Sequence, residues 1–209
     1  RSSAQALGVS ASWTKSRRPL NLADDFLFEL YILFELILDL QNKYNITYIP
    51  GQGTKKHQFP LKPANKEGRP RFEVHTKSDG RLLWQICAGT RIRDIHDVDR
   101  TPDISFQNAD SSETPSYHDV RLIWDAKYKK NPSHNITHAD VSGFGRWLEI
   151  LNLRNADKPE IVFLKLAQLL ANNLITNGLG SNEPEAELTR LDMKEVTSFH
   201  PNSSFEVRP

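Results

Sequence analysis

The sequence of 209 residues has one cysteine and one methionine, and its charges nearly balance. A single cysteine, Cys87, excludes an internal disulfide framework and is typical of a reducing compartment, so we expect a cytoplasmic protein. Lys and Arg number 27 against 26 Asp and Glu, a formal net charge of +1. A nucleic-acid-binding surface would therefore have to come from local clusters of basic residues.

Long apolar segments without charges are also missing. The most apolar run, residues 26–38, contains Glu29 and Glu35 and follows two aspartates. It is too short and too acidic for a membrane span, so we expect no membrane partner. The sequence has no internal repeat and no glycine-rich phosphate loop. Because it begins at Arg1 and not at methionine, we expect it to belong to a larger chain or complex.

The remaining composition, 38% hydrophobic and 25% charged, is that of an ordinary folded domain. We expect a flexible basic lead-in over residues 1–20 and a single domain over 21–209. Within this domain, glycine and proline predict a basic loop at 50–71, and Gly, Asn and Glu predict an acidic loop at 177–187. The basic loop is either solvated or lies over a nucleic-acid groove. Its charged residues are Lys55, Lys56, His57, Lys62, Lys66, Arg69 and Arg71.

Hydrophobic periodicity predicts the regular elements. They are a buried helix over 21–44, a hairpin with strands at 73–76 and 82–88, strands at 101–106 and 120–130, an amphipathic helix over 140–153, and short closing strands at 196–199 and 205–207. The segment 159–175 is ambiguous, but its leucine spacing favours a second helix that includes Leu174. The polar run 107–116 is predicted to be an exposed excursion between two strands.

The strand at 120–130 carries charges that a buried strand should not have. Asp125 and Lys127 are costly to bury unless they are paired or bind a ligand. In an extended chain they share one face, whereas Trp124 and Ala126 share the other. The sequence therefore predicts that the face of Trp124 and Ala126 is packed and that the face of Asp125 and Lys127 carries functional groups.

A second acid, Asp103, opens the strand at 101–106. The two segments Pro102-Asp103 and Asp125-Ala126-Lys127 together resemble the signature of the PD-(D/E)xK nucleases, the restriction-endonuclease-like superfamily. A second acid-x-Lys triplet, Asp192-Met193-Lys194, lacks an apolar strand before it, so context distinguishes the two.

The resemblance implies an α/β fold with a restriction-endonuclease-like core, in which a central mixed β-sheet of about four to five strands is flanked by helices in the order αβββαβ. It also implies a metal-dependent endonuclease that hydrolyses DNA phosphodiester bonds in restriction, defence or repair. The expected ion is Mg²⁺, with Mn²⁺ as the substitute. DNA is favoured over RNA by resemblance alone, and a homodimer is expected if both strands of a palindromic site are cut.

The resemblance also assigns roles to individual residues. Asp103, Asp125 and Lys127 would be catalytic, with Lys127 orienting or deprotonating the attacking water. The metal would be held by Glu29, Asp103, Asp125 and the main-chain carbonyl of Ala126. Lys129 and Lys130 would bind the substrate backbone.

Several alternatives stay open. Glu35 competes with Glu29 for the metal, because the two lie about 120° apart on a helix and are unlikely to reach one site together. His96 lies in the acid-rich segment 91–100, which could bind a metal. The alternating signs of its charges favour a self-compensated loop instead. Asp125 and Lys127 could also form an ion pair in an inactive nucleic-acid-binding or structural module of the same fold. An unrelated α/β domain is the remaining alternative.

Overall fold

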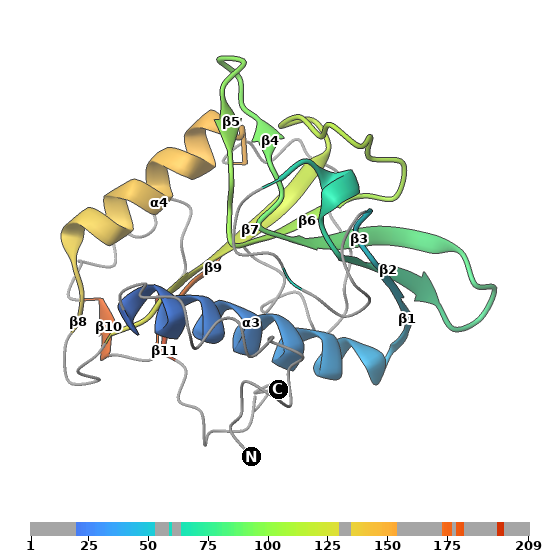
Figure 1. Ribbon diagram of the computed structural model, residues 1–209, viewed down its shortest axis with the longest axis horizontal. Coiled ribbons are helices and arrows are strands. Elements are labelled where there is room, and N and C mark those ends of the chain that lie inside the picture. The colour runs from blue at the N-terminus through green and yellow to red at the C-terminus, as the bar shows by residue number, and fades with distance from the viewer. Residues whose placement is uncertain are drawn as a thin grey trace.

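The computed structural model describes residues 20–52, 59, 64–129, 135–153, 173–176, 179–181 and 196–198. Within them the chain forms an α/β fold with two α-helices and a mixed seven-stranded sheet (Figure 1). None of the helices in these ranges is long and apolar enough to cross a membrane. In chain order the elements are α3 (Leu20–Gln41), β1 (Tyr44–Ile49), η1 (Lys66–Gly68), β2 (Arg71–Thr76), β3 (Leu82–Ala88), β4 (Ile92–Arg93), β5 (Asp99–Arg100), β6 (Ile104–Asn108), β7 (Val120–Lys127), β8 (Asn135–Ile136), α4 (His138–Ile150), β9 (Asn173–Thr176), β10 (Leu179–Ser181) and β11 (Val196–Ser198).

The large sheet has the strand order β1-β2-β3-β6-β7-β9-β11. Its strands are antiparallel from β1 to β7, and β9 and β11 then add parallel to β7. The prediction of four to five strands was therefore too low. The strand β1 was missed because the chain had been assigned to helix as far as Tyr44 and to loop from Pro50. The strand β9 was missed because leucine spacing suggested a helix.

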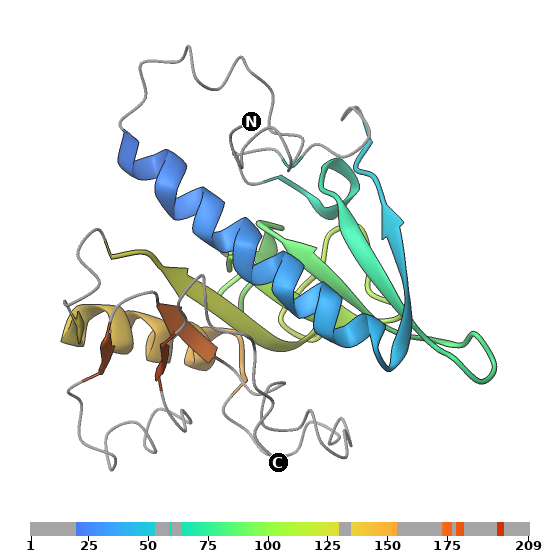
Figure 2. The ribbon, with the colours of Figure 1, turned by 90° about the horizontal axis from the view of Figure 1, so that it is seen from below.

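The two helices cover opposite faces of the sheet at β7. Leu122, Trp124 and Ala126 belong to the hydrophobic core with α3, whereas Val120 and Ile123 belong to the core with α4. In Figure 2, β7 accordingly lies between the helices.

From Leu122 to Lys127 the strand β7 alternates as predicted. The prediction that only one face is packed was wrong, because Ile123 is buried on the face that carries Asp125 and Lys127. Val120 joins the same core as Ile123 because the register shifts between Val120 and Leu122.

The first helix is buried over most of its length, as its apolar sequence predicts. Leu30, Ile32, Leu33 and Leu40 are at most 2% exposed, and Leu38 is the exposed exception. The helix ends at Gln41, three residues earlier than expected, because Tyr44 already pairs with Thr76 in the sheet.

The second helix begins two residues before the predicted start. Thr137 is its N-cap and forms a capping box with Asp140, so that each side chain accepts a hydrogen bond from the other residue's backbone N–H. The predicted apolar stripe is confirmed, since Val141, Phe144 and Leu148 pack against the sheet.

The helix predicted over 159–175 cannot reach Leu174. Residues 173–176 form β9, whose four residues pair with Trp124 to Lys127 of β7. Tertiary pairing with a buried strand has overridden local leucine spacing here. The strand expected at 196–199 is present as β11, and part of the acidic loop forms β10. Residues 1–19 of the lead-in, all of 154–172 and the segment 205–207 lie outside the described residues, as does Asp192-Met193-Lys194.

At Lys66 and Arg69 the basic loop is a buried structural segment, which corrects both readings of its composition for these two residues. Lys66 is 1% exposed and Arg69 is 3% exposed, while Arg71 opens β2. The Lys66 amine donates to the carbonyl oxygen of Ser111 at 2.8 Å and to its hydroxyl at 3.0 Å. The predicted excursion at 107–116 is therefore not simply exposed, because it folds over Lys66. Lys55, Lys56, His57 and Lys62 lie outside the described residues.

Candidate active site

The candidate site lies where β7 extends beyond its neighbour β6. Pairing between these strands begins at Ile104 and Trp124, so Asp125, Ala126 and Lys127 have no β6 residue opposite them. The side chain of Asp103 takes that place, since its carboxylate accepts a 2.7 Å hydrogen bond from the Ala126 N–H.

The main-chain carbonyl of Ala126 points to the same side as Asp103. On the other side of β7, the Thr176 hydroxyl donates to the Lys127 carbonyl at 2.8 Å. Successive residues of a strand direct their N–H and C=O groups to opposite sides, and both groups of one residue point together. The Ala126 carbonyl therefore shares a side with its own N–H and with the Asp103 carboxylate.

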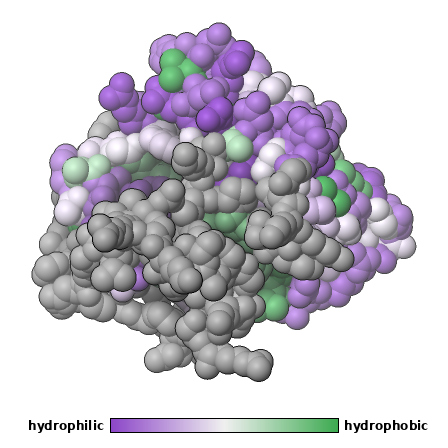
Figure 3. All heavy atoms as spheres, viewed as in Figure 1, coloured by the Kyte–Doolittle hydropathy of each residue, from purple (hydrophilic) through white to green (hydrophobic). Residues whose placement is uncertain are grey.

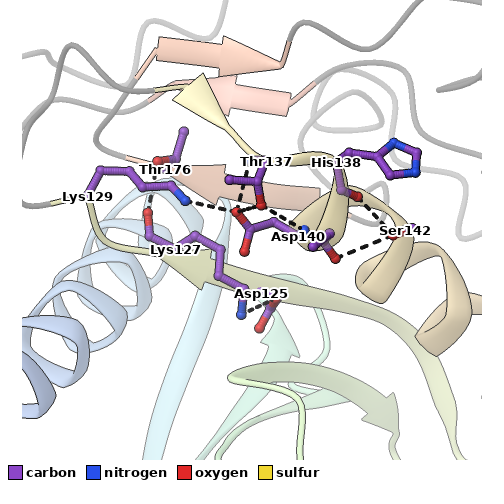
Figure 4. A network of polar contacts seen from close by, with 9 residues as sticks. Asp125, Lys127, Lys129, Thr137, His138, Asp140, Ser142 and Thr176 are labelled. Carbon is purple, nitrogen blue, oxygen red and sulfur yellow. Dashed lines mark hydrogen bonds and ion pairs between the residues drawn. The ribbon is translucent and has the colours of Figure 1, made fainter.

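Asp125 and Lys127 form a close ion pair on one face of β7 (Figure 4). The Lys127 amine lies 2.6 Å from the Asp125 carboxylate, and their side chains are 35% and 13% exposed. Burial opposes the charge on Lys127, but the carboxylates of Asp125 and Asp103 outweigh it, so that the pKa of Lys127 is raised above its ordinary value. Lys127 is a protonated cation at neutral pH.

The acids around this pair hold protons more tightly than ordinary carboxyl groups. Burial raises the pKa of Asp103 well above its usual range, and the neighbouring charges of Asp125 and Glu29 and a hydrogen bond with Asp125 raise it further. Burial, followed by the charge of Asp125, raises the pKa of Glu29 to about 7. Three carboxyl groups thus repel one another in a poorly solvated place.

Of the two candidate glutamates on α3, Glu29 is the one whose charge interacts with this cluster. Its carboxyl group interacts with Asp125, Lys127 and Arg69. Glu35 interacts with Tyr31 instead, where burial first and then the Glu35 carboxylate raise the pKa of the phenol.

A further residue, Arg69, was missed by sequence reasoning. Its guanidinium donates a 2.7 Å hydrogen bond from Nε to the Ala88 carbonyl, and its charge interacts with Glu29. Burial lowers the pKa of Arg69 to about 10, so it remains a cation at neutral pH. The composition of a basic loop does not indicate which of its arginines and lysines become buried.

The two predicted substrate-binding lysines have different outcomes. Lys129 forms a 2.8 Å ion pair with Asp140, the capping residue of α4 (Figure 4). Asp140 therefore neutralises Lys129 while it caps the helix, and its charge also interacts with Lys127. Lys130 lies outside the described residues. The substrate-binding role of both lysines stays a prediction.

The segment 91–100 is a hairpin, β4–β5, whose charges compensate one another. The Asp94 carboxylate accepts the backbone N–H groups of His96 and Val98 and lies 2.7 Å from the Arg100 guanidinium. His96 is exposed. On the face drawn in Figure 3 the described residues are mainly hydrophilic. Ile95 and Val98 are the exposed apolar residues of this hairpin. The hairpin therefore matches the self-compensated reading of the sequence.

Whether the site suits a divalent cation depends on its donors. Among the described residues, no three His, Cys, Asp or Glu side chains are placed to hold a metal ion as they stand. Carboxylates and a main-chain carbonyl are nevertheless the hard oxygen donors that Mg²⁺ accepts. Burial first, and then the neighbouring carboxylate of Asp125, disfavours the charged forms of Asp103 and Glu29 and raises their pKa values, and a bound cation would offset both effects. The donor types and the charge fit a divalent cation, although the side chains do not form a complete ligand set as they stand.

Comparison with known proteins gives no match to a family model, to a curated protein or to a solved structure. The fold itself defines the class of protein at a coarse level, an α/β domain with a mixed sheet and a helix on each face.

Proposed function

We propose that this chain is a metal-dependent endonuclease with a restriction-endonuclease-like fold that hydrolyses phosphodiester bonds in DNA. The observation that carries the proposal is the gathering of Asp103, Asp125, Lys127 and Glu29 at the end of β7, beside the carbonyl of Ala126. Three acids with a single close lysine exceed what a structural ion pair requires.

The chemistry follows from the groups present. Glu29, Asp103, Asp125 and the Ala126 carbonyl would hold Mg²⁺, or Mn²⁺ in its place. The cation supplies charge neutralisation for the phosphoryl oxygens and an acidified water. Lys127 carries a raised pKa, which favours orienting the water and stabilising developing negative charge over removing the water's proton.

Lys129 and Lys130 follow β7 directly and would contact the phosphate backbone next to the cleaved bond. For Lys129 this requires the phosphate to share or displace Asp140, its present partner. DNA is preferred to RNA because of the resemblance of the motif, and restriction, defence and repair are the corresponding cellular roles.

The test is cleavage of plasmid DNA, single-stranded DNA and RNA in Mg²⁺, Mn²⁺ or EDTA by the wild type and by folded Asp125→Ala and Lys127→Ala proteins. Cutting that requires metal and is lost in both variants would support the proposal and name the substrate. Asp192→Ala and Lys194→Ala are matched controls, because they change the second acid-x-Lys triplet and should cut normally.

An inactive module of the same fold is the second candidate, and the 2.6 Å ion pair between Asp125 and Lys127 favours it. This candidate predicts no cleavage and no Mg²⁺ or Mn²⁺ binding by calorimetry. It also predicts that replacing either residue changes folding stability and nothing else.

A further inference from the structure

Arg69 is a buried arginine that is bonded to the end of β3 and whose charge interacts with Glu29 on α3. Its guanidinium donates to the carbonyl of Ala88, the last residue of β3. The next residue, Gly89, donates its N–H to the carbonyl of Asp103 at 2.9 Å. Arg69 is thereby fixed to the segment that positions Asp103.

Two glycines make room for this arginine. A Cβ atom at Gly89 would lie 2.5 Å from Nη2 of Arg69, so the guanidinium rests directly against the glycine backbone. Gly89 also has a φ of 57°, which disfavours other residues. At Gly51, a Cβ atom would lie 2.8 Å from the backbone nitrogen of Arg69. The backbone of Arg69 is therefore packed against Gly51, and its guanidinium is packed against Gly89.

The charge of Arg69 also interacts with a carboxyl group of α3. Among the residues whose charges act on Arg69, Glu29 ranks first. Because Arg69 is only 3% exposed, solvent screens this attraction weakly. Burial of this kind prevents Arg69 from contacting a substrate directly and leaves it to act through Glu29.

We propose that Arg69 is a positioning residue that holds the Glu29 carboxylate at a set place relative to Asp103, so that acids from a helix and a strand can bind one cation. The proposal rests on the metal-dependent function proposed above. Groups that orient metal ligands without touching the metal are a regular part of such sites.

The charge of Arg69 taken alone would have the opposite effect, because a nearby cation repels Mg²⁺ or Mn²⁺. If repulsion dominated, Arg69→Gln would bind metal more tightly and Arg69→Lys would resemble the wild type. If positioning dominates, both variants bind more weakly, since lysine cannot reproduce the planar guanidinium that bonds the Ala88 carbonyl and rests against Gly89. The sign of the change therefore separates the two effects.

The experiment is calorimetric titration of Mn²⁺ into the full chain, for the wild type, Arg69→Gln, Arg69→Lys and the control Arg71→Gln. Arg71 is a suitable control because it is two residues away and pairs with Glu113 at 3.6 Å. We expect Arg69→Gln to weaken Mn²⁺ binding by about 10- to 100-fold, a usual loss for such a group. Arg69→Lys should lose affinity too, and Arg71→Gln should lose none.

A double-mutant cycle tests whether Arg69 acts through Glu29. On a Glu29→Gln background, Arg69→Gln should cause no further loss of Mn²⁺ affinity. Arg69→Lys serves in the cycle if Arg69→Gln does not fold, as judged by circular dichroism. Unchanged or tighter binding by both Arg69 variants would overturn the inference, as would a loss that persists on the Glu29→Gln background. A wild type that binds no Mn²⁺ would instead refute the proposed metal site, and this inference with it.

Discussion

Two clusters of buried polar side chains lie in this fold, and they differ in how completely their members are satisfied. The first, the Lys66 network, is a chain of hydrogen bonds beside β3 and β6. Lys66 donates to Ser111, whose hydroxyl donates to Gln107 at 2.8 Å, and the Gln107 amide donates to Ser105 at 3.1 Å. Donors and acceptors alternate along this chain, as a structural network requires.

The second, the carboxylate cluster of Glu29, Asp103 and Asp125, contains more like charge than its cations offset. Burial and mutual repulsion raise the pKa values of Glu29 and Asp103. Such an arrangement costs folding stability and persists where a ligand or a reaction uses it. The comparison indicates that surplus like charge, and not burial of charge as such, distinguishes a candidate site from a structural network.

The largest expected effect is on catalysis. Asp125→Asn removes one carboxylate from a cluster that has too many, so the free energy of unfolding should change little. Cleavage in Mg²⁺ should fall by about 10³-fold, because a group that acts in the transition state is lost. Gel assays of plasmid cutting and urea denaturation measure the two quantities. Equal cutting by variant and wild type would place the chemistry elsewhere.

The Lys66 network should respond in the opposite way. Lys66→Met leaves the carbonyl and hydroxyl oxygens of Ser111 without the donor they now have, and we expect the free energy of unfolding to fall by about 2–3 kcal/mol. Cleavage per folded molecule should stay unchanged. Loss of cutting in a protein shown to be folded would contradict the separation of the two clusters.

The carboxylate cluster should also make stability depend on pH. The pKa of Glu29 rises from 4.5 to about 7 on folding, so between these values the folded state binds more protons than the unfolded state. Stability therefore decreases as pH rises through this window, by at most about 3 kcal/mol. Partial exposure of Glu29 reduces this figure.

The measurement is a series of urea denaturation curves between pH 4.5 and 8 without metal. Glu29→Gln should weaken the decrease and raise stability at pH 8, whereas Glu35→Gln should leave the slope as it is. If Glu35→Gln flattens the slope and Glu29→Gln does not, the choice between the two glutamates is reversed.

The smallest expected effect is on DNA affinity. Lys129→Met removes one phosphate contact, so the slope of log Kd against log salt should change by about one unit. Fluorescence anisotropy in Ca²⁺, which should support binding without cutting, measures this slope. Lys77→Met is the control, since Lys77 lies at the β2–β3 turn and donates to the carbonyl of Asn42. If the slope for Lys129→Met equals that of the wild type, Lys129 does not contact a phosphate and its ion pair with Asp140 has only a structural role.

Local sequence patterns were sufficient for the helix of Glu29 and the strand of Asp125, whereas Asp103 precedes the strand predicted to carry it, which begins at Ile104. Alternation of apolar and polar residues predicted the two faces of β7, and the triplet from Asp125 to Lys127 singled out its charged face. Continuous apolar character predicted α3, and resemblance selected Glu29 over Glu35. These properties are readable because each depends on residues close together in the chain.

Long-range contacts account for what could not be predicted. Lys66 is buried by Ser111, 45 residues later, and Arg69 by the carbonyl of Ala88. Both residues belong to a segment whose composition indicates only a basic loop. Leu174 is in a strand because it pairs with Asp125 of β7, although the spacing of the leucines before it in the sequence favoured a helix.

The pairing of β9 with β7 bears on the order in which the protein is made. The strand that bears Asp125 and Lys127 leaves the ribosome well before residues 173–176, which complete its hydrogen bonds on one side. The Thr176 hydroxyl, which holds the Lys127 carbonyl, arrives 49 residues after it. Until then the nascent chain has the acids of the site without the strand that fixes their backbone, so assembly of the site is a late event in synthesis.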